Sequence, residues 1–230
     1  MITIPAQLIT IEGSDGAGKE TQGKMLHARL SGLGKKVAMV SFPRYRQTAA
    51  GWALYEALKG HNAPAYRFEK VDPQAASLLY ASDRKQSLPF LCELMGTHDI
   101  VILDRYVESN LLHQGGKFAS VEEREVFAEW LFDLEYRSLA LPRPDITLYL
   151  RLPYEISRRR ASERAQKKRE PLDSVERDDA YTKNSYEAGL FYAKHFGWTI
   201  IPCTDSTGRE LSQEEVHDCI FRELSSPLLL

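Results

Sequence analysis

Two glycines and a lysine have the spacing of a loop that binds the phosphates of a nucleotide. The stretch "IEGSDGAGKET" fits the pattern G-x-x-x-x-G-K through Gly13, Gly18 and Lys19. In such a loop, backbone N–H groups face the phosphates and the lysine supplies a mobile cation for the outer ones. Glu20 takes the next position, where a magnesium-binding hydroxyl is usual. The candidate loop comprises Gly13, Ser14, Asp15, Gly16, Ala17, Gly18, Lys19, Glu20 and Thr21.

An acidic and a basic residue end a predicted central strand in the stretch "ILDRY". We expect the Asp104 carboxylate to face the phosphate loop, where it could hold magnesium directly or through water. The guanidinium of Arg105 suits a phosphate that must be positioned as well as attracted. A local ion pair at a strand end is the alternative interpretation of these two residues.

Two further stretches combine aromatic and basic side chains. "FPRY" follows the second predicted strand and offers Arg44 and Tyr45, although a structural turn would also explain it. In "YASDR", Tyr80 and Arg84 are four residues apart and therefore lie on one face of a helix. An aromatic platform beside an arginine could hold a nucleobase, whereas a core tyrosine with a surface arginine is the plainer interpretation.

A basic segment spans residues 158–180. It follows a strand end and precedes a long helix, which is where P-loop kinases carry a closing lid. Closure would exclude water and bring cations to the transferring phosphoryl group. We do not expect a nucleic-acid partner, because acidic residues interrupt the segment and the net charge of the chain is −2.

Apolar runs and helix signals indicate the elements that position these residues. Strands are predicted at 7–12, 35–42, 99–104, 145–152 and 198–203, and helices at 19–33, 51–60, 73–95, 120–139 and 211–224. The helix from residue 73 should be kinked or broken near Pro89. Alternation of strands and helices predicts an α/β fold, a five-stranded parallel sheet with helices on both faces, in one domain over residues 1–230. Ligands bind such sheets at the carboxyl ends of the strands.

The composition of the chain argues against several classes of protein. The three cysteines, Cys92, Cys203 and Cys219, are odd in number and form no C-x-x-C pair, which argues against a disulfide framework or a zinc site. No apolar run approaches the ~20 residues of a membrane span. The first residues lack the features of a signal peptide. We therefore expect a cytoplasmic protein without a membrane partner.

Together these motifs resemble the thymidylate kinase family of P-loop nucleoside-monophosphate kinases. The resemblance rests on "IEGSDGAGK", "FPRY" and "DRYVESNLLHQG", in that order along the chain. It implies transfer of the γ-phosphoryl group from ATP to dTMP with Mg²⁺, by a homodimer. Some members carry an arginine in the phosphate loop, whereas this chain has Gly16, so the lid arginines Arg160 and Arg164 should supply the charge there.

The resemblance also implies a role for individual residues. Catalytic residues would be Lys19, Arg105, Asp15, Arg160 and Arg164. The acceptor nucleotide would be bound by Asp15, Phe42, Pro43, Arg44, Tyr45, Tyr80, Arg84, Arg105, Ser109, Asn110, His113, Gln114, Asp173 and Glu176. Magnesium would be held by Asp15, Asp104 and Glu20. Within these sets, Tyr80 would stack on thymine, Arg84 would bond its O4 atom, and Asn110 would face its N3 edge.

This chain departs from the family at Glu20, usually Ser or Thr, and at His113, usually Tyr or Phe. The alternative functions are a deoxynucleoside kinase, another nucleotide kinase, or a non-catalytic nucleotide-binding P-loop protein. A nucleoside kinase needs a carboxylate base for a neutral hydroxyl, but Pro43, Arg44 and Tyr45 follow the second strand here. The chain also lacks the N-K-x-D motif of a GTPase switch.

Overall fold

Five parallel strands form the centre of the molecule. The computed structural model describes residues 6–60, 63–168 and 175–225. The strands are β1 (Gln7–Gly13), β2 (Val37–Ser41), β3 (Ile100–Asp104), β4 (Ile146–Arg151) and β5 (Thr199–Pro202). Their order in the sheet is β2-β3-β1-β4-β5, and every neighbouring pair is parallel. The predicted five-stranded parallel sheet is therefore confirmed.

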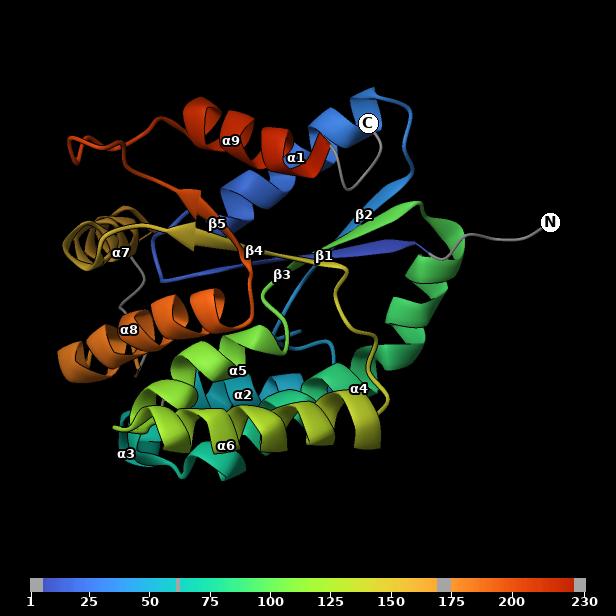
Figure 1. Ribbon diagram of the computed structural model, residues 1–230. Helices are drawn as coiled ribbons and strands as arrows, with labels where there is room; N and C mark the ends of the chain where they lie inside the picture. The colour runs from blue at the N-terminus through green and yellow to red at the C-terminus, as the bar shows by residue number, and fades with distance from the viewer. Residues whose placement is uncertain (1–5, 61–62, 169–174, 226–230) are drawn as a thin grey trace.

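Helices cover both faces of the sheet (Figure 1). The helices are α1 (Lys19–Gly32), α2 (Ala49–Lys59), α3 (Ala63–Tyr66), α4 (Pro73–Thr97), α5 (Glu108–His113), α6 (Val121–Phe132), α7 (Tyr154–Lys168), α8 (Asp179–His195) and α9 (Gln213–Ser225). One face packs on α1 and α9 through Leu26, Leu30 and Ile220. The opposite face packs on α4, α5, α6 and α8, where Phe127 and Tyr192 are among the buried side chains.

The register of the two central strands places the predicted site residues next to one another. Ile11 of β1 pairs with Asp104 of β3, so the phosphate loop and Arg105 leave the same edge of the sheet. Side chains alternate between the faces of a strand. Glu12 therefore points, like Leu8, toward the face covered by α5, and it is fully buried there.

The helices differ from the sequence prediction at several places. α4 runs unbroken through Pro89, so a break there is excluded. Because Pro89 has no backbone N–H, the carbonyl of Lys85 loses its usual intrahelical partner. Both residues lie on the exposed side of the helix, where water can bond that carbonyl. The helix predicted over 120–139 is α-helical only to Phe132 and continues as a π-helical turn, Asp133–Ser138. The helices α3, α5 and α7 were not predicted.

Among the described residues, no helix combines the length and the apolar character needed to cross a membrane.

Candidate active site

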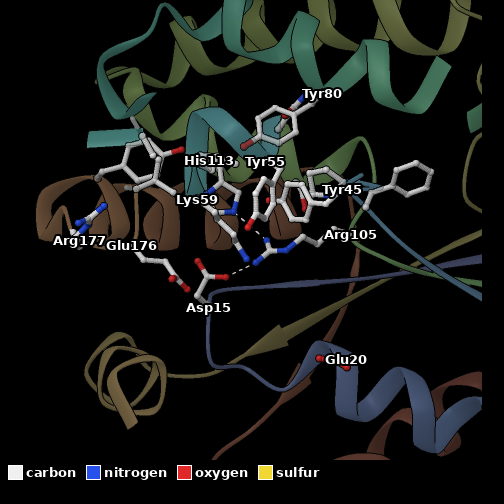
Figure 2. Close-up of a pocket in the computed structure, with 18 of the residues that line it drawn as sticks. Asp15, Glu20, Tyr45, Tyr55, Lys59, Tyr80, Arg105, His113, Glu176 and Arg177 are labelled. Carbon is white, nitrogen blue, oxygen red and sulfur yellow. Dashed lines mark hydrogen bonds and ion pairs between the residues drawn. The ribbon is translucent and has the colours of Figure 1, made fainter. Parts of the chain in front are cut away.

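A cleft of about 720 Å³ opens at the carboxyl ends of β1 and β3. Its walls come from the phosphate loop and from α2, α4, α5, α7 and the segment before α8. Figure 2 shows Asp15, Arg105 and His113 joined in a row near the rings of Tyr45 and Tyr55. The cleft therefore brings together residues of the phosphate loop and residues predicted to bind the acceptor nucleotide.

The phosphate loop wraps around the side chain of its own lysine. Gly16 and Gly18 have φ angles of +84° and +92°, a left-handed conformation that favours glycine. Lys19 begins α1, and its Nζ donates to the carbonyl oxygens of Gly13, at 2.8 Å, and Ser14, at 2.9 Å. Burial and the neighbouring Arg105 lower the pKa of Lys19 to about 8. The loop thus holds a buried cation at the mouth of a helix N-terminus, the geometry of a phosphate site.

Arg105 connects the phosphate loop to the cleft. Its guanidinium forms an ion pair with Asp15 and bonds Nε2 of His113 at 3.1 Å. Burial and Arg105 lower the pKa of His113 to about 4, so its neutral ring nitrogen can accept this bond. The pKa of Asp15 lies well below its usual range, because the attraction of Arg105 and Lys19 outweighs the effect of burial. The cations Lys19 and Arg105 and the anion Asp15 therefore lie together where a phosphate would enter.

Ser109 is fixed by a carboxylate within the sheet. Its hydroxyl donates to Glu12 at 2.6 Å, and the backbone N–H of Tyr106 donates to the same carboxyl group at 2.8 Å. Burial raises the pKa of Glu12 above its ordinary value. Sequence reasoning did not single out Glu12, although a carboxylate inside the apolar run "QLITIEG" was a visible signal.

The predicted base-binding residues meet at the other end of the cleft. Arg84 is buried and donates to Glu135 and to the carbonyl oxygen of Tyr106. Asn110 donates to the same carboxylate at 3.3 Å. Tyr80 lines the cleft and meets Phe68 edge-on, with 6.0 Å between ring centroids. Nothing in the sequence pattern pointed to Glu135.

The side chains of the FPRY segment, residues 42–45, lie partly in the cleft and partly on the surface. Phe42, Pro43 and Tyr45 line the cleft. Arg44 does not line it: its guanidinium bonds Gln47 and lies 4.1 Å above the ring of Phe90.

Of the two lid arginines predicted to act, one reaches the cleft. Arg164 lines it and forms an ion pair with Glu176, which lines it as well. Arg160 instead bonds Glu210 through its Nε at 2.9 Å and does not line the cleft. Asp173, predicted to contact the acceptor, lies outside the described residues.

Gln114 and the metal candidates are spread over different positions. Gln114 is fully buried, away from the cleft lining, and its side chain has no hydrogen-bond partner among the described residues. Asp104 is half-buried and accepts from the hydroxyl of Ser41 at 3.4 Å. Glu20 lines the cleft as well, but its exposed carboxylate bonds Lys24 at 2.6 Å and lies apart from Asp15 (Figure 2). The described part of the chain contains no group of three or more acidic, His or Cys residues that could hold a metal by itself.

The lining residues that were not predicted include Tyr55, Lys59, Arg177 and Tyr181. Lys59 ends α2 immediately before Gly60, the predicted helix stop, so its position was partly visible in the sequence. The ring of Tyr181 stacks on that of His113, with centroids 6.1 Å apart. This contact joins α8 to α5, two elements that the sequence pattern does not relate.

Comparisons with known proteins agree on one family. The sequence model described as thymidylate kinase matches residues 11–208. The thymidylate kinase of Mycobacterium tuberculosis is 35% identical over 174 residues, which are 74% of this chain and 78% of that protein. The human thymidylate kinase is 29% identical over 146 residues, 63% of this chain and 60% of its own length.

Among solved structures, a thymidylate kinase from Candida albicans superposes with a TM-score of 0.72 at 24% identity. The match covers 97% of this chain and 93% of that one. At this level of identity, the structural likeness concerns the fold.

Proposed function

Because the chain belongs to the thymidylate kinase family, we propose that its cleft transfers the γ-phosphoryl group of ATP to dTMP, giving dTDP. The observation that carries this proposal is the position of Arg105. Its guanidinium lies between Asp15 of the phosphate loop and His113 of the acceptor cleft. This position supports one charged centre shared by the two substrates in a single kinase domain.

The transfer requires positioning and charge neutralisation more than covalent help. An oxygen of the dTMP phosphate attacks the γ-phosphorus in line, and the bond from that phosphorus to the β–γ bridging oxygen breaks. The attacking oxygen is already anionic at neutral pH, so no general base is needed. Lys19 and Arg105 offset the charge on the phosphates, and Arg164 adds a third cation from α7.

Magnesium supplies charge neutralisation on the ATP phosphates in this class of reaction. The carboxylates of Asp15 and Asp104 suit a hard cation that keeps several waters. Both lie close enough to Lys19 to act on its charge. Glu20 fits this role less well, because its carboxylate is exposed and bonded to Lys24.

At the far end of the cleft, the acceptor base stacks on Tyr80 and is read by Arg84 and Asn110. The neutral ring of His113, between Arg105 and Tyr181, borders the sugar.

The active form is a homodimer in the cytoplasm. Support for the dimer comes from large apolar side chains exposed on two helices that pack together, α2 with Trp52 and α4 with Leu78 and Phe90. Support for the compartment comes from the cysteines, all of which are free thiols. Sedimentation velocity of the wild-type chain tests the dimer, which a monomer at micromolar concentration would contradict.

A coupled ADP-release assay with ATP, magnesium and each nucleoside monophosphate tests the function. We expect the highest kcat/KM with dTMP and no activity with thymidine. Phosphorylation of thymidine would instead indicate a nucleoside kinase. Lys19→Ala should lower kcat by about 100-fold or more, since one preorganised charge contributes that much. Lys24→Ala, on the exposed side of the same helix, is the matched control and should leave kcat unchanged. Near-normal turnover in Lys19→Ala would refute the assignment.

A further inference from the structure

Glu135 contacts two residues of the base-binding end of the cleft, although it does not line the cleft itself. It lies in the π-helical turn Asp133–Ser138 and is fully buried. Its carboxylate accepts from Nε of Arg84 at 2.6 Å, from Nη2 of Arg84, and from Nδ2 of Asn110 at 3.3 Å. One buried carboxylate thus holds both residues proposed to read the base.

The contact fixes which way the Asn110 amide faces. A carboxylate paired with a guanidinium only accepts hydrogen bonds, so Asn110 must turn its NH₂ group toward Glu135. The carbonyl oxygen Oδ1 then points the other way, and no described residue donates to it. Asn110 lines the cleft, so this side of it presents an acceptor to a bound base.

The same carboxylate determines which N–H groups of Arg84 remain for a bound base. A guanidinium has five N–H donors and no acceptor. Glu135 takes two of them and the carbonyl of Tyr106 takes a third, at 3.2 Å, so two donors remain (5 − 3 = 2). Arg84 lines the cleft and can therefore offer only donors to the base.

A neighbouring contact keeps the turn in place against α5. The hydroxyl of Tyr136 donates to Glu108 at 2.5 Å, directly beside Glu135 and one residue before Ser109. Because the π-helical turn and α5 are joined at two successive residues, Glu135 has little freedom to move away from Asn110.

A hydrogen-bond donor from Arg84 next to an acceptor from Asn110 matches only some of the pyrimidine bases. Thymine and uracil present an acceptor at O4 beside a donor at N3–H. Cytosine presents an amino donor at position 4 beside an acceptor at N3, which opposes the site at both atoms. We propose that Glu135 is the positioning residue that makes this kinase select a thymine or uracil edge over cytosine. This inference rests on the proposed function.

Glu135→Gln tests the proposal, because an amide can donate as well as accept. Asn110 is then free to turn either way, and the site loses its fixed pattern. We expect the ratio of kcat/KM for dTMP to that for dCMP to fall by about 100-fold, the scale set by mismatched buried hydrogen bonds. The ratio for dTMP to dUMP should not change, because these bases share the same edge.

Asp133→Asn is the matched control in the same turn. Asp133 is exposed and pairs with Arg137, so the ratio for dTMP to dCMP should equal that of the wild type. The KM for ATP should be the same in all three proteins, which separates an effect on the base from a general loss of structure. Circular dichroism and thermal unfolding establish that each variant is folded.

The outcomes distinguish this inference from the proposed function. Absence of dTMP phosphorylation by the wild type would overturn the function itself. A wild type active on dTMP, with an unchanged ratio for dTMP to dCMP in folded Glu135→Gln, would overturn only the role of Glu135. Should Glu135→Gln not fold, the double variant R84M/E135Q removes both buried charges together. We expect it to prefer neither base, and a retained preference for dTMP would overturn the proposal.

Discussion

Glu108 should make the stability of the protein fall as the pH rises through neutrality. The side chain is 4% exposed, and its Oε2 atom has no partner among the described residues. Burial raises the pKa of its carboxyl group from 4.5 to about 7, although the hydroxyl of Tyr136 opposes the shift. The folded protein therefore keeps a proton on Glu108 that the unfolded chain releases near its ordinary pKa.

The sign and the size of the effect follow from this difference in proton binding. Between pH 4.5 and pH 7 the folded state binds more protons than the unfolded state, so the free energy of unfolding decreases with pH. The contribution is fully present below pH 4.5 and is lost as the pH passes about 7. A shift of 2.5 units (7 − 4.5) at ~1.4 kcal/mol each corresponds to about 3.4 kcal/mol. About 2.5 kcal/mol of this falls between pH 5 and pH 8.

Glu108→Gln isolates this contribution, because glutamine has nearly the same shape and does not titrate. Urea unfolding of both proteins at pH 5, 6, 7 and 8 gives the difference in free energy of unfolding. The wild type should lose about 2.5 kcal/mol relative to the variant across this range. Glu129→Gln, on the exposed side of α6, should show no such trend. A difference between wild type and Glu108→Gln that stays constant with pH would refute the reasoning.

The phosphate loop and the neighbouring Asp104 provide four further tests. Since the pKa of Lys19 is about 8, kcat/KM for ATP should decline as the pH rises above that value, and a flat profile from pH 7 to 9 would contradict this. Gly16→Ala should lower kcat and the Tm, because its Cβ would lie 2.7 Å from the carbonyl oxygen of Ser157 at a φ of +84°. Glu20→Ser should leave the magnesium dependence of kcat unchanged, whereas Asp104→Asn should raise the magnesium concentration needed for half-maximal rate.

The sheet and the phosphate loop could be predicted because their signals are local. Each strand is a short apolar run closed by glycine, proline or a charged residue, and the loop glycines stand at fixed spacing. Once β1 and β3 are parallel neighbours, the meeting of Asp15 and Arg105 follows from their positions at the strand ends. This part of the site is therefore a consequence of strand order and register.

The base-binding end could not be predicted in the same way. A single π-helical turn is too short to show its own periodicity in the sequence, so residues 120–139 read as one continuous helix. The direction in which Glu135 points is therefore hidden. The helix α5 spans only Glu108–His113 and is stabilised by burial of Leu111 and Leu112 against other elements rather than by its own sequence.

Spacing along a helix also failed to distinguish the arginines of α7. Arg160 and Arg164 are four residues apart, so the pattern treats them as equivalent. Their partners are Glu210, which is 50 residues from Arg160 and precedes α9, and Glu176, which is 12 residues from Arg164 and precedes α8. Tertiary contacts alone decide which arginine faces the cleft.

The contact between the phosphate loop and α7 couples the position of that helix to the loop. The hydroxyl of Ser157 donates to the backbone carbonyl of Asp15 at 2.5 Å, and Gly16 leaves no space for a side chain between them. The first turn of α7 is thus hinged on the loop that binds the nucleotide. At ~1.5 Å per residue, Arg164 lies about 10 Å (7 × 1.5) along α7 from Ser157. A rotation of a few degrees at this fulcrum, driven by phosphates entering the loop, would carry Arg164 through a larger arc than the loop itself travels.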